Sequence, residues 1–116
     1  MNKKTIDKLI PEAIEQLKTL EKRGKVEKVY NGYLASFGPT VITSGLKKTV
    51  TIYADKASSN AKRRSVTQIM FDLIGEDMDG YVAQKGNERD YAFKQKLLEA
   101  NIACKLAIRT FVLDEE

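Results

Sequence analysis

The apolar residues of this chain recur about every 3.6 positions along almost its whole length, which is the period of one face of an α-helix. The first such stripe runs from Ile6 to Leu20 and passes Pro11 without a change of phase. An interior proline costs a helix about 3 kcal/mol, so we expect a kink at Pro11 rather than a new helix. Further stripes cover residues 26–41, 66–74 and 93–111. The pattern predicts an all-α protein.

Glycine, proline and polar clusters mark the ends of the predicted helices. Gly38–Pro39 interrupts the second stripe, which predicts two helical pieces joined by a bend, and Gly45 closes that segment. Residues 46–57 alternate like a strand but also show helical spacing, and we interpret them as helix because the sequence offers no partner strand. Asn87 is expected to cap a long final helix over 88–113, followed by a frayed tail.

A chain of 116 residues is of the size of one domain. We therefore expect one helical domain, residues 1–116, built as an orthogonal bundle of five to six helices with a long C-terminal helix. No apolar run is long enough to span a bilayer, and the basic N-terminus lacks the apolar stretch of a signal peptide. The single cysteine, Cys104, lies within an apolar stripe and is expected to be buried and inert. These features favour the reducing cytoplasm.

The residue types that are missing exclude several classes of enzyme and metal site. The chain has no histidine, which excludes Ser-His-Asp and Cys-His triads and histidine-ligated metals. One cysteine excludes thiolate zinc clusters and iron–sulfur centres. The sequence contains neither a Walker-type phosphate loop nor a Rossmann glycine motif. We predict that the chain has no catalytic residues and needs no cofactor or metal.

The basic residues are the candidate binding residues. Lys and Arg number 20 against 16 Asp and Glu, and the net charge of +4 permits an anionic partner. Lys62, Arg63 and Arg64 lie in the first turn of a predicted helix, and Lys47 and Lys48 begin the preceding one. Cations at a helix N-terminus oppose the helix dipole and cost about 0.3–1 kcal/mol each. A bound phosphate backbone would explain their placement, and solvated basic turns are the alternative.

Other charged groups are interpreted as surface. Two further basic groups fit a solvated surface better than a binding site, namely Lys22, Arg23, Lys25 and Lys28 at a turn and Lys105 and Arg109 on the final helix. Asp72, Glu76 and Asp79 are spaced to share a helix face, where they could hold Mg²⁺ for phosphodiester hydrolysis. Gly75 is expected to break that helix, so a metal-dependent nuclease is the least favoured hypothesis.

The segment Tyr30–Leu46 resembles part of a known family. It contains Tyr30-Asn31-Gly32-Tyr33-Leu34-Ala35, then Gly38-Pro39, Val41-Ile42 and Gly45-Leu46. These residues, the chain length and the long final helix resemble the small α-helical subunit of the type III-B (Cmr) CRISPR effector complex. The resemblance implies structural roles for Gly45 as a helix stop and Leu46 as a core anchor, and for Pro39 as the proline that precedes Val41-Ile42 in the motif.

The resemblance also implies a function and a set of partners. Such subunits are non-catalytic and stack with copies of themselves in the inner filament of the complex. The expected partners are CRISPR RNA, target RNA, the large polymerase-like subunit and the backbone subunits, with no membrane. The assignment of RNA binding to Lys47, Lys48, Lys62, Arg63 and Arg64 rests on their chemistry rather than on the family motif. The alternative function is a homodimeric helical DNA-binding regulator that uses residues 61–68 as its recognition helix.

Overall fold

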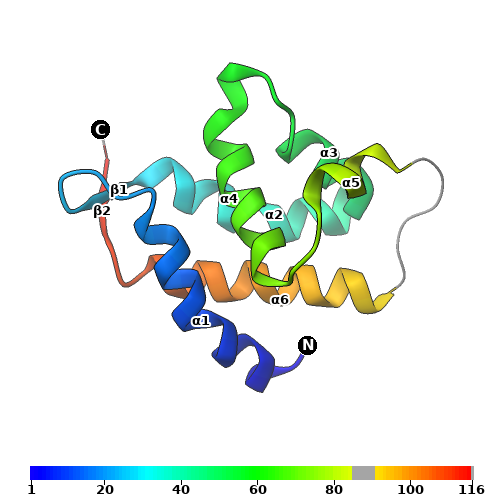
Figure 1. Ribbon diagram of the computed structural model, residues 1–116, viewed down its shortest axis with the longest axis horizontal. Helices are drawn as coiled ribbons and strands as arrows, with labels where there is room; N and C mark the ends of the chain where they lie inside the picture. The colour runs from blue at the N-terminus through cyan, green and yellow to red at the C-terminus, as the bar shows by residue number, and fades with distance from the viewer. Residues whose placement is uncertain (85–90, 116) are drawn as a thin grey trace.

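Helix α6 forms the centre of the molecule, and helices α1, α2 and α4 pack against it (Figure 1). The computed structural model describes residues 1–84 and 91–115. Within these ranges the α-helices are α1 (Lys3–Lys18), α2 (Lys28–Ser44), α3 (Leu46–Tyr53), α4 (Ala61–Leu73), α5 (Met78–Ala83) and α6 (Tyr91–Ile108). Helices α1 and α4 cross α6 steeply, whereas α2 runs along it. The predicted all-α bundle with a long C-terminal helix is confirmed.

The apolar stripes predicted from the sequence form the core. On α6 the side chains of Leu97, Ala100, Cys104 and Ala107 are fully buried. They meet buried residues of the helices around them, such as Leu17 of α1. Because three other helices pack against α6, a wide arc of its surface is apolar.

Helix α1 begins at an asparagine cap and continues through its proline. The Asn2 side-chain oxygen accepts hydrogen bonds from the backbone N–H groups of Lys4, at 2.9 Å, and Thr5, at 3.4 Å. The Asn2 backbone N–H donates to the buried Glu99 carboxylate on α6 at 2.8 Å. Pro11 lies inside the helix without ending it, so the prediction that the helix does not restart there is confirmed.

The predicted break at Gly38–Pro39 is wrong, because α2 continues through both residues to Ser44. Pro39 removes one helical hydrogen bond, the one that its N–H would have donated to the Ala35 carbonyl. Ala35 and Pro39 both lie on the exposed side of the helix, where water can bind that carbonyl. The helix ends at Gly45, whose φ of 88° is in the region that favours glycine.

The ambiguous segment after Gly45 is helical, as predicted. Helix α3 covers Leu46–Tyr53 and buries Leu46, Val50 and Tyr53. Thr49 is buried, and its hydroxyl donates a hydrogen bond to the Gly45 carbonyl at 2.8 Å. The polar group of this β-branched residue therefore has a partner inside the protein. Leu46 is 1% exposed, so the expected core anchor directly follows the expected helix stop.

The prediction that the chain contains no paired strands is wrong. Strand β1 (Lys25–Glu27) pairs in parallel with β2 (Val112–Asp114), in the register Lys25 with Val112 and Glu27 with Asp114. Helix α6 ends at Ile108 instead of 113. Of the tail predicted to fray, Leu113 and Asp114 are held in this pairing, and Glu116 lies outside the described residues. Three-residue strands are too short for their period to be read from sequence. The predicted cap Asn87 and the predicted helix start at 88 lie outside the described residues.

Two short segments complete the connections. A short 3-10 helix, Ser58–Asn60, directly precedes α4. Helix α4 ends before Gly75, whose φ is 66°, as expected from the sequence, and α5 follows in the connection to α6. Within the described residues, no helix is long and apolar enough to cross a membrane.

Candidate nucleic-acid interface

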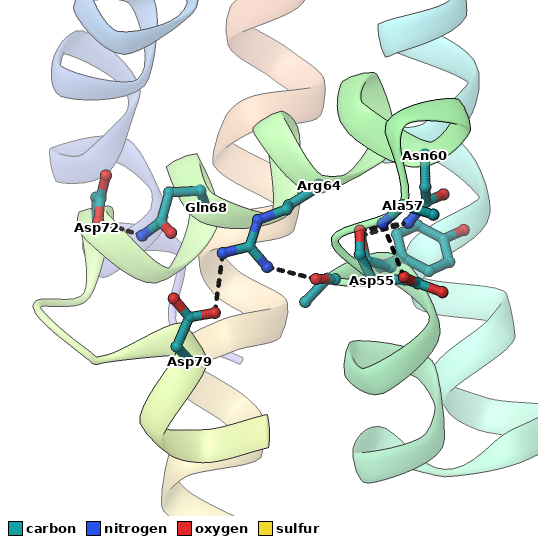
Figure 2. Close-up of polar contacts among 9 residues, drawn as sticks. Asp55, Ala57, Asn60, Arg64, Gln68, Asp72 and Asp79 are labelled. Carbon is teal, nitrogen blue, oxygen red and sulfur yellow. Dashed lines mark hydrogen bonds and ion pairs between the residues drawn. The ribbon is translucent and has the colours of Figure 1, made fainter. Parts of the chain in front are cut away.

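The predicted basic residues lie at the N-termini of α3 and α4, as the sequence indicated. Lys62, Arg63 and Arg64 lie in the first turn of α4, which begins at Ala61 directly after Asn60. The Asn60 side chain does not cap the helix. Its amide instead donates to the carbonyls of Ile52 and Asp55 at the end of α3, each at 3.1 Å, and Figure 2 shows Asn60 beside Asp55. The first turn of α4 is thereby fixed against the end of α3.

Lys62 points toward the start of α2. Its ammonium donates to the Glu27 carboxylate at the end of β1, and both side chains remain partly exposed. That hydrogen bond raises the pKa of Lys62 above its usual value. The charge of Lys62 is therefore offset, but the side chain is still half exposed to solvent.

Arg63 lies over two aromatic rings. Its guanidinium carbon is 5.2 Å from the centre of the Tyr53 ring and 5.9 Å from that of Tyr33. Its Nε donates to the Asn60 side-chain oxygen. A cation–π interaction of this kind is worth about 0.5–1 kcal/mol where the cation is partly exposed, so it helps to hold the guanidinium beside the rings of α2 and α3.

Arg64 joins three elements through its two terminal nitrogens (Figure 2). One nitrogen donates to the Ala54 carbonyl just after α3, and the other pairs with the Asp79 carboxylate of α5 at 2.9 Å. The hydrogen bond from Arg64 lowers the pKa of Asp79. The three cations of this turn thus have acceptors or rings within the chain, and these offset the unfavourable position of the cations at a helix N-terminus without an external anion.

Lys47 and Lys48 differ sharply although they are neighbours. The Lys47 ammonium donates to the backbone carbonyls of Tyr81 and Val82, the latter at 3.1 Å, and lies 4.6 Å from the centre of the Tyr81 ring. It therefore satisfies the C-terminal carbonyls of α5, where a cation is favoured by the helix dipole. Lys48 is exposed, and no described residue forms an ion pair or side-chain hydrogen bond with it. Lys47 and Arg64 bind α5 from its two ends.

The acidic trio does not form a metal site. Asp79 pairs with Arg64, and Asp72 accepts a hydrogen bond from Gln68 at 2.8 Å (Figure 2). Among the described residues, no three carboxylate, cysteine or histidine side chains are grouped so that they could hold a metal ion. The arrangement gives the nuclease hypothesis no support.

Cys104 is buried, as predicted, and burial raises the pKa of its thiol to about 12. A thiol that does not ionise near neutral pH is a poor nucleophile, which agrees with the expected inertness.

Sequence reasoning missed the partners of the basic residues. Arg64 and Asp79 are separated by 15 residues, and Lys62 and Glu27 by 35. No local spacing rule connects such pairs, because each depends on how the helices pack.

The comparisons with known proteins give one match. The family model described as "CRISPR-associated protein (Cas_Cmr5)" matches residues 7–113 of the chain. No curated protein and no solved structure matches.

Proposed function

The chain belongs to the Cas_Cmr5 family of CRISPR-associated Cmr subunits, and we propose that it is the non-catalytic small subunit of a type III-B (Cmr) ribonucleoprotein effector in antiviral defence. In this role it stacks with copies of itself in the inner filament and contacts the guide and target RNA. The observation that carries the proposal is the extent of the family match, which covers residues 7–113. Cutting of the target is assigned to the backbone subunits.

We assign the RNA contact to the basic surface made by Lys47, Lys48, Lys62, Arg63 and Arg64. Lys48 is exposed, Lys62 is half exposed, and Arg63 is intermediate in exposure. Arg64 and Lys47 have more of their hydrogen-bond donors engaged within the chain. Their main role is therefore to hold α3, α4 and α5 together, so that Lys48, Lys62 and Arg63 are correctly placed. Lysine and arginine side chains contact phosphates without reading base sequence, as a subunit that tracks a guided duplex requires.

Stacking with copies requires side chains that remain available after folding. Ile42 of α2 is 80% exposed, and a shallow apolar groove of about 210 Å³ lies beside it, lined in part by Pro39, Leu98 and Ile102. An exposed isoleucine next to an apolar groove suits a contact between protein surfaces. We propose this face of α2 and α6 as one of the stacking contacts.

The DNA-binding alternative gains no specific support from the geometry. A recognition helix should present free polar side chains to base edges. In the segment 61–68, Arg64 and Gln68 are engaged with Asp79 and Asp72.

The proposal is tested by purifying the tagged chain from its native cells, with and without ribonuclease treatment, followed by sequencing of bound RNA and mass spectrometry. We expect several co-purifying subunits and short RNAs that share a repeat-derived 5′ tag. A single homodimeric species bound to DNA, or to no nucleic acid, would contradict the proposal.

A further inference from the structure

The turn between α1 and β1 holds three cations in a fixed arrangement. Lys22 and Lys25 face each other across an antiparallel bridge, with backbone N–H groups donating to the opposite carbonyls at 2.7 and 3.0 Å. Arg23 and Gly24 form the tip, with φ values of 55° and 76°. The turn projects from the end of the molecule at which β1 and β2 pair (Figure 1).

This geometry places like charges together. Residues that face each other across an antiparallel pair project from the same side, and like charges at such positions are destabilising. The tip of a two-residue hairpin turn favours Asn-Gly, because both positions need a positive φ, yet position 23 is an arginine. The turn thus accepts unfavourable residues at three of its four positions.

The three cations line a hollow in which they outnumber the carboxylate groups among the described residues. A hollow of about 580 Å³ is lined by Lys22, Arg23, Lys25 and the Asp114 side of β2. Across residues 1–84 and 91–115, no carboxylate forms an ion pair with any of the three cations. This distinguishes them from Lys62, Arg64 and Lys47, which have acceptors within the chain.

The lining also indicates the class of ligand. Among the described residues, the hollow is lined by Lys22, Arg23, Lys25 and Asp114, all of them charged and none apolar or aromatic. The centre of a protein–protein interface is depleted of charge and enriched in aromatic residues, so this hollow fits a phosphate-rich polymer better than an acidic protein. A phosphodiester between Lys22 and Lys25 would remove the repulsion between them.

We propose that the Lys22–Lys25 turn is a phosphate-backbone binding site for RNA, separate from the basic residues at the starts of α3 and α4. This inference rests on the proposed function for the identity of the polymer. The bound backbone lies across the hollow, with the lysines on one side of the turn and Arg23 at its tip. Recognition is independent of base sequence, because each of the three cationic groups binds phosphate oxygens.

The first experiment maps the site on the full chain. Backbone amide NMR signals are followed while a short oligouridine is added at low and at high salt. We expect saturating shifts at the amides of residues 22–25 that disappear at high salt. Shifts confined to other surfaces, or no shifts at any concentration, would overturn the inference.

The second experiment uses a charge-matched pair of variants in the same RNA titration. The turn variant is Lys22→Gln/Arg23→Asn/Lys25→Gln, in which Asn-Gly preserves the turn type. The control is Lys4→Gln/Lys8→Gln/Lys96→Gln, which removes the same charge from exposed positions on α1 and α6. We expect the turn variant to lose at least about tenfold in affinity at low salt and about 2 units of the log–log salt slope, since each single-strand phosphate contact contributes about 0.7.

The remaining outcomes separate this inference from the proposed function. Equal losses in both variants would mean that binding follows net charge, which overturns the turn site. Tighter binding of polyglutamate than of oligouridine would assign the turn to an acidic protein. Co-purification of the wild-type chain with effector subunits and RNA tests the proposed function independently, so that function can stand while the turn site fails.

Discussion

The Arg64 guanidinium of α4 and the Asp79 carboxylate of α5 lie 2.9 Å apart and link two elements on either side of Gly75. The ion pair keeps the pKa of Asp79 below its usual value. A carboxyl group whose pKa is lowered by folding contributes stability above its unfolded pKa of about 3.9, and loses it as the pH falls through its folded pKa. This pair therefore stabilises the fold at neutral pH and not in strong acid.

The first prediction concerns Asp79→Asn. We expect a lower melting temperature than that of the wild type at pH 7 and no difference once the pH is well below the folded pKa of Asp79. Thermal unfolding followed by circular dichroism across this pH range checks it. Asp72→Asn is the matched control, because Asn can still accept the hydrogen bond from Gln68. A constant deficit at every pH would mean that the ion pair is not the cause.

The second prediction contrasts neighbouring lysines. Lys47→Met removes the donor to the Tyr81 and Val82 carbonyls, and we expect a loss of roughly 1 kcal/mol in unfolding free energy, with faster amide exchange in α5. Lys48→Met should stay within about 0.5 kcal/mol of the wild type but weaken RNA binding. Urea denaturation and amide exchange measure the structural role of Lys47, and RNA titration measures the binding role of Lys48. If the two variants behaved alike, the assignment of separate roles would fail.

The third prediction concerns two glycines of different conformation. Gly45→Ala forces a side chain into a backbone of φ 88° and should destabilise the protein by about 1–2 kcal/mol. Gly32→Ala, within α2, adds a Cβ that meets no atom within 4 Å, and should stabilise the protein by about 0.5–1 kcal/mol. Chemical denaturation of both variants measures the two changes in unfolding free energy. If both variants were stabilised, or both destabilised, the helix-stop role of Gly45 would be contradicted.

The fourth prediction concerns Cys104. A buried thiol with a pKa of about 12 should not react with a thiol reagent at pH 8 while the protein is folded. Labelling should follow the population of unfolded protein as denaturant is added, because exposure of this side chain requires opening of the core. The dependence of the labelling rate on denaturant concentration shows whether labelling requires unfolding. Fast labelling without denaturant would show that α6 opens locally.

The fifth prediction concerns self-association. Ile42→Ser removes an exposed apolar side chain and should reduce the number of copies of this chain in the purified complex, with a change in stability within about 0.5 kcal/mol. Native mass spectrometry of the complex counts the copies. Ile52→Ser, at a half-exposed position on α3, is the comparison. An unchanged copy number for Ile42→Ser would remove this face from the proposed stacking contacts.

The sequence predicted the features that depend on local spacing. The stripe from Ile6 to Leu20 established α1 through Pro11, and Gly45 was recognised as the end of α2 because few other residues adopt its conformation. The helical interpretation of Leu46–Tyr53 was also correct. Each of these rests on residues within a few turns of one another.

The features that were missed depend on residues distant in sequence. The pairing of Val26 with Leu113 creates strands that have no period of their own, and Pro39 is tolerated because its side of α2 is exposed. The positions of the basic residues at the starts of α3 and α4 were predicted correctly, whereas their partners Glu27 and Asp79 could be found only from the packing of the helices.

The central position of α6 has a consequence for synthesis of the protein. Leu97, Ala100 and Cys104 supply the surface on which α1, α2 and α4 pack, so none of these helices can bury its apolar face fully until α6 has been made. The growing chain on the ribosome therefore carries α1 through α5 as an incomplete domain. Its core can be completed only once α6 has emerged from the ribosome.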